Sequence, residues 1–471
     1  MSTRHPQVKN LDSPHALRAR LEELGLDVPV ADTVSATGSL ADAVSFNDAT
    51  AGTLSSPNRF AVLPMEGWDG TADGRPTELV RRRWQRFADS GCGLVWGEAT
   101  AVVPDGRANP NQLVINETTV EDLAGLRALL DPAQVAGIQL THSGRWAKPD
   151  GTAQPRPAQR HRVLDDRTGV TSDTALLSDD ELDELIERFA EAALLASQAG
   201  FDFVDIKCCH GYLLHELLGA RNRPGRFGGD FQGRTRFFRE AVAAVRDRAP
   251  SIAIAVRVSA FDQVPFRSGA DGVGEPDTGA DLPTPFGGGA DGVSVDLAET
   301  HAFVDLAREL GIGLVCTTAG SPYYNPHLQR PAYFPPSDGY KPPEDPLVGV
   351  ARQLTATASL RAAHPDVTII GSGYSYLQDW LPEVAQAVVD RSGADMIGLG
   401  RMILSYPHLA ADVLAGRSLD RRLVCRTFSD CTTAPRHGLV SGCYPLDDFY
   451  NSRPERIELA AIKREVRQKG L

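Results

Sequence analysis

The alternation of short apolar strands with helical segments constrains the fold of this chain more than any other feature. Eight candidate strands, each followed by a helical run, occur in this order: Arg59–Leu63, Leu94–Gly97, Gly137–Leu140, Phe203–Ile206, Ile252–Val258, Gly313–Cys316, Val367–Gly371 and Ala394–Leu399. Strands that alternate with helices form parallel sheets, and eight strand–helix units favour a closed barrel over an open, doubly wound sheet. We therefore predict an α/β fold built on a single (β/α)8 TIM barrel.

The helical runs carry recognisable start signals and an apolar face. The clearest runs from Ser178 to Ser197 and begins with the sequence Ser-Asp-Asp-Glu. A serine at this position caps free backbone N–H groups, and acidic residues in the first turn interact favourably with the helix dipole. The segments Glu299–Leu310 and Leu377–Asp390 are amphipathic as well, so we predict helices at all three places.

Two segments flank the barrel, which we place at residues 56–422. Residues 1–55 form an N-terminal extension with one helix, Pro14–Leu24, and are expected to cover the floor of the barrel. Residues 423–471 form a C-terminal tail that is expected to pack on the barrel and that ends in a charged helix, Arg453–Gln468.

A long insertion, at about residues 261–295, follows the fifth strand. It is rich in Gly, Asp and Pro, and the sequence GADGV occurs in it twice, starting at Gly269 and Gly289. The loops that follow barrel strands lie on the active-site side of a TIM barrel. We consider two interpretations, a disordered segment and a lid that closes over a substrate.

Composition and charge bound the classes of function. Of 471 residues, 42% are apolar and 23% are charged, as in ordinary globular proteins. The net charge, 48 − 61 = −13, argues against nucleic acid or an anionic membrane as partner. We find neither an apolar stretch long enough to span a membrane nor a secretory signal, and seven cysteines in so long a chain suggest reduced thiols. These features predict a cytoplasmic enzyme.

The segment after the fourth strand carries the clearest chemical signal. Lys207, His210 and Tyr212 follow Ile206 within six positions. The carboxyl ends of barrel strands are the edge at which active sites are built. Lys207 and His210 are able to hold an anionic oxygen of a substrate, and Tyr212 is able to supply a proton, so we predict these three as catalytic residues.

The last two strands end in glycine-rich turns. One reads Ile-Gly-Ser-Gly-Tyr and contains Gly371 and Gly373; the other contains Gly400 and Arg401. Glycine lets backbone N–H groups approach a phosphate closely, and an arginine makes paired hydrogen bonds to phosphate oxygens. These strand ends are the usual phosphate site of a TIM barrel, although glycine also serves ordinary tight turns.

Taken together, the strand ends from Arg59 to Leu414 resemble the old yellow enzyme family of NADH:flavin oxidoreductases and FMN-dependent ene-reductases. The resemblance implies an FMN cofactor, reduced by NAD(P)H, that contacts the following residues: Pro64, Met65, Glu66, Ala99, Gln139, Arg257, Gly371, Gly373, Gly400 and Arg401. In this arrangement Gln139 hydrogen-bonds the pyrimidine edge of the flavin, and Arg257 stabilises the anionic reduced ring. Taken singly, Gln139 is equally suited to satisfying backbone groups and Arg257 to a barrel-core ion pair.

The resemblance implies one reaction, and three alternative functions stay open beside it. The implied reaction passes hydride from reduced flavin to an activated alkene, an enone or enoate, with Tyr212 as proton donor. The alternatives are a flavin enzyme that oxidises an amine or saturated ring, a flavin-free aldolase-like barrel with Lys207 as Schiff-base nucleophile, and a flavin-binding protein without catalysis. A small-molecule substrate is expected, but its identity, the choice of NADH or NADPH and the oligomeric state, including a homo-oligomer, stay open.

Lys207 departs from the family, which commonly has histidine at this position. An ammonium group is always a hydrogen-bond donor, whereas imidazole is able to be neutral. Three alternatives stay open for Lys207. It favours a substrate with a carboxylate or enolate, it pairs with Glu66, or its side chain extends to solvent.

The tail cysteines Cys425, Cys431 and Cys443 are a second departure. Some larger relatives of the family hold a four-iron cluster on four cysteines, and only the Cys431–Cys443 spacing matches. Because such clusters normally need four thiolates, we predict no iron–sulfur cluster and no metal site. Cys208 and Cys209 are predicted to be small packing residues.

Overall fold

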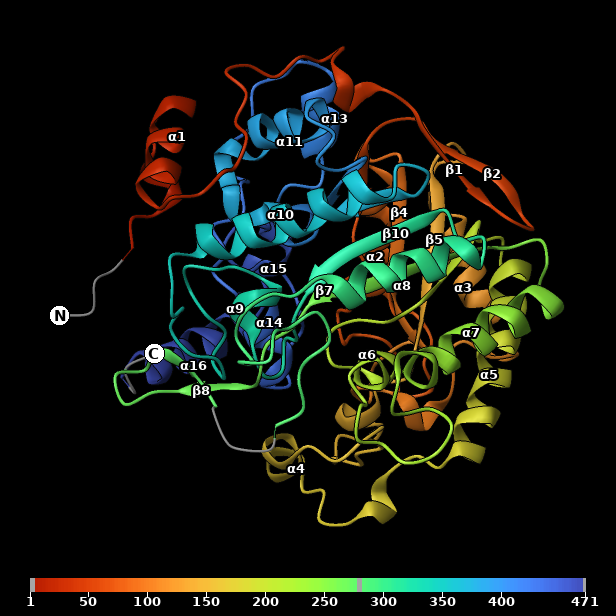
Figure 1. The fold of residues 1–471 in the computed structure, drawn as a ribbon. Helices are drawn as coiled ribbons and strands as arrows, with labels where there is room; N and C mark the ends of the chain where they lie inside the picture. The colour runs from red at the N-terminus through yellow and green to blue at the C-terminus, as the bar shows by residue number, and fades with distance from the viewer. Residues whose placement is uncertain (1–4, 278–281, 469–471) are drawn as a thin grey trace.

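The computed structural model describes residues 5–277 and 282–468, and its centre is a closed barrel of parallel strands (Figure 1). In chain order the barrel strands are β3 (Phe60–Val62), β4 (Leu94–Ala101), β5 (Val135–Thr141), β6 (Phe203–Ile206), β7 (Ala253–Phe261), β10 (Leu314–Ala319), β11 (Thr368–Gly371) and β12 (Met396–Leu399). β12 pairs in parallel with β3, which closes the ring. All eight predicted strands and the (β/α)8 fold are confirmed.

A helix follows each strand on the outside of the barrel. These outer helices are α2 (Glu78–Ala88), α3 (Val120–Arg127), α5 (Asp179–Gln198), α7 (Phe231–Arg248), α8 (Ala298–Glu309), α10 (Pro346–Ala363), α11 (Leu381–Asp390) and α13 (Leu409–Leu414). The predicted start of α5 is confirmed: the Ser178 hydroxyl accepts from the Glu181 N–H at 3.2 Å, and the Glu181 carboxylate accepts from the Ser178 N–H at 2.7 Å. This reciprocal capping box satisfies two otherwise free backbone donors.

The prediction of a helix over Leu377–Asp390 is wrong in its first part. Residues Tyr374–Trp380 form a tight 3-10 segment in which Gln378 has φ 55°, and α11 begins only at Leu381. A left-handed residue interrupts helical geometry, and Pro382 in the first turn of α11 suits a new helix start. The predicted helix Glu299–Leu310 is confirmed as α8, one residue earlier at each end.

The floor of the barrel is covered by a hairpin of β1 (Val44–Asp48) and β2 (Gly52–Ser56). Val44 and Phe46 pack into the barrel interior with Trp96 and Phe203. The Asp48 carboxylate accepts from the Ile254 N–H at 3.1 Å and pairs with Arg246 at 3.3 Å, which fastens the hairpin to the barrel. The two strands of the hairpin were not predicted from the sequence, since their outward residues are polar. The predicted first helix is confirmed as α1 (Pro14–Glu23).

Shorter elements occupy the chain between the barrel strands and in the tail: α4 (Arg162–Thr168), α6 (Leu213–Leu218), α9 (Pro326–Gln329), α12 (Arg401–Ser405), α14 (Asp430–Arg436), α15 (Asp448–Asn451) and α16 (Glu455–Gln468). The tail is tied to the barrel loops, because Arg82 donates to Asp447 at 2.9 Å and Ser429 donates to the Phe334 carbonyl at 2.6 Å. Figure 1 shows α14 and α16 at the end of the barrel opposite the β1–β2 hairpin. In the part of the chain that the structure describes, we find no helix with both the length and the apolarity of a membrane span.

The insertion after β7 contains a small hairpin of β8 (Phe266–Ser268) and β9 (Gly274–Pro276). Both GADGV copies form the same turn: the Asp271 and Asp291 carboxylates accept from backbone N–H groups two residues later, at 2.9 and 3.0 Å. The fourth residue of each copy is a glycine with positive φ. The repeat is thus a turn motif. Residues 278–281 of the insertion lie outside the described residues, and its role as a lid stays a prediction.

Replacing Ser178 with alanine is expected to lower the free energy of unfolding by about 1 kcal/mol, because the N-terminus of α5 loses its capping hydroxyl. Urea unfolding followed by far-UV circular dichroism measures the change. Ser197→Ala on the same helix is the matched control, since Ser197 makes one exposed hydrogen bond, to Ser251, and is expected to cost a few tenths of a kcal/mol. Equal losses for both variants would contradict the capping role.

Candidate active site

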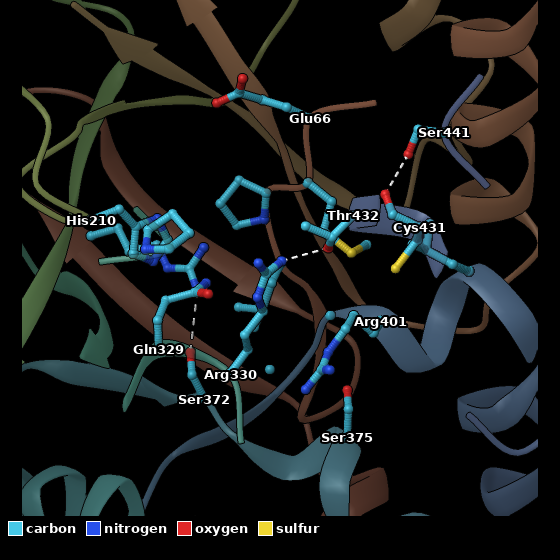
Figure 2. Close-up of a pocket in the computed structure, with 18 of the residues that line it drawn as sticks. Glu66, His210, Gln329, Arg330, Ser372, Ser375, Arg401, Cys431, Thr432 and Ser441 are labelled. Carbon is cyan, nitrogen blue, oxygen red and sulfur yellow. Dashed lines mark hydrogen bonds between the residues drawn. The ribbon is translucent and has the colours of Figure 1, made fainter. Parts of the chain in front are cut away.

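A large cavity opens at the carboxyl ends of the barrel strands (Figure 2). The space between its walls, including the part open to solvent, is about 1280 Å³. Eleven of the thirteen residues predicted from the sequence line the cavity: Pro64, Met65, Glu66, Gln139, Lys207, His210, Tyr212, Arg257, Gly373, Gly400 and Arg401.

Ala99 and Gly371 are not part of this lining. Ala99 is buried in β4, and its carbonyl accepts from Gln112 at 3.0 Å. A Cβ added to Gly371 would lie 2.8 Å from the Tyr374 hydroxyl, so this glycine allows Tyr374 to pack closely against β11. The predicted contacts of these two residues with a flavin therefore lack support from the geometry of the cavity wall and stay predictions.

The turn after β6 is held in an unusual backbone conformation. His210 and Gly211 both have positive φ, 66° and 75°. The His210 N–H donates to the Ser259 hydroxyl at 3.1 Å, and the Ser321 hydroxyl donates to the His210 carbonyl at 2.9 Å. A left-handed non-glycine residue costs on the order of 1–3 kcal/mol and persists where its surroundings enforce it. These contacts fix the direction of the His210 side chain, whose Nε2 lies 3.2 Å from the Thr318 hydroxyl.

Glu66, Lys207 and Tyr212 form one buried cluster. Lys207 Nζ lies 3.7 Å from Glu66 Oε1 and 3.7 Å from the centre of the Tyr212 ring. The Tyr212 hydroxyl is 3.4 Å from Glu66 Oε1 and 3.1 Å from the hydroxyl of Tyr323. The Lys207 side chain is only 3% exposed, so the alternative in which it extends to solvent is wrong. The contact with Glu66 that the sequence suggested is present.

Burial controls the protonation of this cluster. It raises the pKa of Glu66, against the attraction of Lys207, and lowers the pKa of Lys207, against the attraction of Glu66. Burial, and then the charges of Arg257 and Lys207, lower the pKa of His210 well below 6.5. Burial and then Glu66 raise the pKa of Tyr212 well above 10. At neutral pH the imidazole is therefore neutral and the phenol keeps its proton.

The Asp205 carboxylate organises the part of the cavity wall that contains Gln139 and Arg257. It accepts from the Gln139 side chain at 2.5 Å, from the Trp96 indole at 2.9 Å and from the Arg257 backbone N–H at 2.8 Å. Gln139 thus donates to a carboxylate rather than to the backbone and keeps its amide oxygen as an acceptor. Sequence reasoning missed Asp205; its only signal was a charged residue inside an apolar strand.

Arg257 and Arg401 line the cavity, and each has a buried donor without a hydrogen-bond partner among the described residues. Arg257 donates to the Ser372 hydroxyl at 3.4 Å, while its Nε is buried and has no hydrogen-bond partner among the described residues. Arg401 donates to the Pro331 carbonyl at 2.8 Å, and its Nη1 is buried without a partner in the same part of the chain. Buried, unpaired donors are costly, so an acceptor is expected beside both arginines.

The glycines beside Arg401 leave room for such an acceptor. Gly373 has φ 99°, and a Cβ added to Gly400 would have no neighbour closer than 4.0 Å. Together with Ser372 and Ser375, which also line the cavity, these residues offer donors and close backbone approach. This corner fits a phosphate, and the wall with Gln139 and Arg257 fits the polar edge of a flavin ring; the residues present therefore fit FMN.

Part of the wall comes from residues that sequence reasoning missed: Trp68, Tyr323, Gln329, Arg330, Thr432, Arg436 and Ser441. They belong to long loops and to the tail, in which no periodic pattern or motif marks them. Their approach to the barrel is decided by packing of the tail, as the Arg330 hydrogen bond to Thr432 at 2.5 Å illustrates (Figure 2).

The cysteines are unpaired and mostly buried. Cys208 and Cys209 are fully buried, as expected for packing residues. Burial raises the pKa of Cys425, Cys431 and Cys443, which opposes formation of thiolates. Within residues 5–277 and 282–468 we find no group of three or more acidic, histidine or cysteine side chains arranged to hold a metal ion. The absence of an iron–sulfur cluster stays a prediction.

Three comparisons place the chain among known proteins. An NADPH dehydrogenase of Bacillus subtilis is 25% identical over 370 residues, 78% of this chain and 92% of that enzyme. The solved old yellow enzyme homologue from Zymomonas mobilis, 22% identical, superposes with a TM-score of 0.55 over 81% of this chain and 94% of its own. Histamine dehydrogenase from Rhizobium sp. 4-9, 20% identical, reaches 0.65 over 87% of this chain, which spans only 52% of that protein. At these identities the two solved structures support the fold alone.

The match to a family model decides the classification. Residues 46–274 match the NADH:flavin oxidoreductase / NADH oxidase family, and this range contains Glu66, Gln139, Arg257 and the turn from Lys207 to Tyr212. The resemblance to old yellow enzymes that the strand ends predicted is thereby confirmed. The chain belongs to the NADH:flavin oxidoreductase / NADH oxidase family and is a flavin-dependent oxidoreductase.

Proposed function

We propose that this enzyme uses FMN and NAD(P)H to reduce an activated alkene, an enone or enoate. The observation that carries the proposal is the meeting of two different walls in one cavity. One wall holds Lys207, His210 and Tyr212; the other holds Gln139 and Arg257. The first suits a substrate whose carbonyl gains negative charge, and the second suits a flavin ring.

FMN, when bound, would supply the redox chemistry, taking a hydride from NAD(P)H and giving one to the alkene. The protein's part is to orient and polarise. Gly373, Gly400 and Arg401 would hold the phosphate, and Gln139 would accept from the pyrimidine ring. Arg257 would stabilise negative charge on the reduced ring.

Lys207 and His210 would hold the activating oxygen of the substrate. Neutral His210 donates one hydrogen bond, and Lys207 adds a full positive charge. Both act where negative charge grows during hydride addition, so they are expected to stabilise the transition state more than the bound substrate. Glu66 offsets part of the cost that burial imposes on a charged Lys207.

Tyr212 would protonate the α-carbon of the alkene. Its pKa lies well above 10, so the hydroxyl is protonated at neutral pH. The hydroxyls of Tyr212 and Tyr323 lie 3.1 Å apart, and Glu66 is within 3.4 Å of the first. These neighbours orient the phenol and provide a route by which the proton is replaced after transfer.

Oxidation of an amine is the second candidate, since the overall fold is shared with histamine dehydrogenase. The charges in the cavity favour alkene reduction instead. Among the described residues that line the cavity, Glu66 is the one carboxylate, and it pairs with Lys207. A protonated amine would have to compete with that ammonium group in a wall that is otherwise cationic. A flavin-free Schiff-base reaction at Lys207 is set aside because the chain is a flavin enzyme.

Tyr212→Phe is expected to slow re-oxidation of the reduced enzyme by an enone about 100- to 10,000-fold, since the proton donor is lost. The rate of flavin reduction by NADPH and the FMN content are expected to stay within about twofold of wild type, because Tyr212 acts only as an acid toward the alkene. Anaerobic stopped-flow spectroscopy measures the two half-reactions separately. Tyr323→Phe, which removes the neighbouring phenol, is the control; an equal loss in both variants would argue against Tyr212 as donor.

Replacing Glu66 with glutamine and Lys207 with methionine is expected to reveal a coupling of about 1–3 kcal/mol in unfolding free energy. Each single change leaves its partner as an unpaired buried charge, whereas the double change removes both charges. Urea unfolding of the four proteins gives the coupling. The more exposed pair Glu344–Arg352, at 2.7 Å, is the control and is expected to couple by less than about 1 kcal/mol. If the effects of the two single changes add up to the effect of the double change, Glu66 and Lys207 do not interact and the proposed pair is refuted.

Because the pKa of His210 lies well below 6.5, its imidazole stays neutral at every pH above that lowered value. The affinity of the oxidised enzyme for a neutral enone is therefore expected to show no step near pH 6.5 between about pH 5.5 and 8. Titration of the flavin absorbance measures the affinity. His210→Asn is expected to bind more weakly with the same pH profile; a wild-type step that disappears in this variant would show that His210 titrates.

A further inference from the structure

Arg330 is a cationic side chain of the cavity to which the proposed reaction assigns no role. It follows α9, in the loop after β10. Its Nη1 donates to the Thr432 hydroxyl at 2.5 Å. Its Nε and Nη2 are buried and have no hydrogen-bond partner among the residues that the structure describes. A guanidinium group with two unpaired donors inside a cavity needs an acceptor that the protein itself does not provide.

The neighbours of Arg330 are also cations. Burial, followed by the charges of Arg436 and Arg401, lowers the pKa of Arg330 to about 9, so the group is still protonated at neutral pH. Arg436 has an ion pair with Asp338 and a hydrogen bond to the Pro322 carbonyl at 2.9 Å. Arg330 has no ion pair with any carboxylate in the described part of the chain. An anion beside Arg330 would relieve this repulsion.

Arg330 lies toward the substrate side of the cavity as well as toward Arg401. Figure 2 shows its guanidinium between His210 and Arg401. Its charge contributes to the lowered pKa of His210, after burial and the larger effects of Arg257, Lys207 and His215. It also opposes the burial that raises the pKa of Tyr323, the neighbour of Tyr212. Both effects require that Arg330 lies near the groups proposed to hold and protonate the alkene.

We propose that Arg330 is a specificity-determining residue that binds a carboxylate on the substrate, so that the preferred alkenes carry an acid group in addition to the activating carbonyl. This inference rests on the proposed function. Lys207 and His210 would hold the carbonyl oxygen, and Arg330 would hold the carboxylate in a paired hydrogen bond through Nε and Nη2. The same chemistry would serve the FMN phosphate, so the test must separate the two anions.

The test compares β-benzoylacrylic acid with its methyl ester, which differ in one negative charge. Binding to the oxidised holoenzyme is measured, without NAD(P)H, from the change in flavin absorbance. In Arg330→Gln the dissociation constant for the acid is expected to rise about 10- to 100-fold, the usual effect of losing a hydrogen bond to a charged group. The ester is expected to change by less than about twofold, because it lacks the charge that Arg330 binds.

Two further variants keep the result interpretable. Arg330→Lys retains the charge without the planar fork and is expected to fall between wild type and Arg330→Gln for the acid. Arg421→Gln is the control, since Arg421 is 62% exposed and pairs with Asp379 outside the cavity. It is expected to leave both dissociation constants unchanged. If Arg330→Gln fails to fold, the dissociation constants of acid and ester for Arg330→Lys test the proposal instead.

Each outcome has a defined meaning. Equal effects on acid and ester, or no effect on either, would overturn the proposal. Loss of FMN from Arg330→Gln, seen as released flavin fluorescence, with an unchanged ratio of acid to ester affinity, would also overturn it and assign Arg330 to the cofactor phosphate. If the acid binds through Arg330 but neither compound is reduced by NAD(P)H, the anion site stands and the proposed reaction fails.

Discussion

The buried carboxylate of Asp205 ties four consecutive barrel strands together at the level of the cavity. From β6 it accepts hydrogen bonds from Trp96 on β4, Gln139 on β5 and the backbone of Arg257 on β7. Burial raises the pKa of Asp205 to about 6, so it is largely ionised at neutral pH and acts as a strong acceptor. The orientation of Gln139 and the register of β7 depend on it, and with them the wall that fits a flavin.

The part of the wall that contains Lys207, His210 and Tyr212 depends on backbone strain and burial rather than on one organising residue. The left-handed His210 turns the chain so that Lys207, His210 and Tyr212 face one space, and Ser259 and Ser321 hold that turn. Burial lowers the pKa of His210 and raises the pKa of Tyr212, which leaves a neutral imidazole and a protonated phenol beside the contact of Lys207 with Glu66. The charge pattern from which we propose alkene reduction follows from this packing.

Most of the fold was predictable because each barrel strand is an apolar run of few residues, bounded by turn residues and followed by an amphipathic helix. The same local signals located the strand-end motifs, since the strand order of a parallel barrel brings all carboxyl ends to one face. The failures have local causes. The β1–β2 hairpin has polar outward residues, and the expected helix at Leu377 is broken by the left-handed Gln378 and the proline of α11.

The sequence by itself determined the barrel, the family and the residues that each strand end presents, because these depend on local patterns and on chain order. Only the tertiary structure decided which distant groups complete the cavity. Three contacts illustrate this: Lys207 with Glu66, Gln139 with Asp205, and Arg330 with Thr432. The two residues of each contact lie between 66 and 141 positions apart in the chain. Such contacts arise from burial and charge in three dimensions, and no periodic pattern along the chain encodes them.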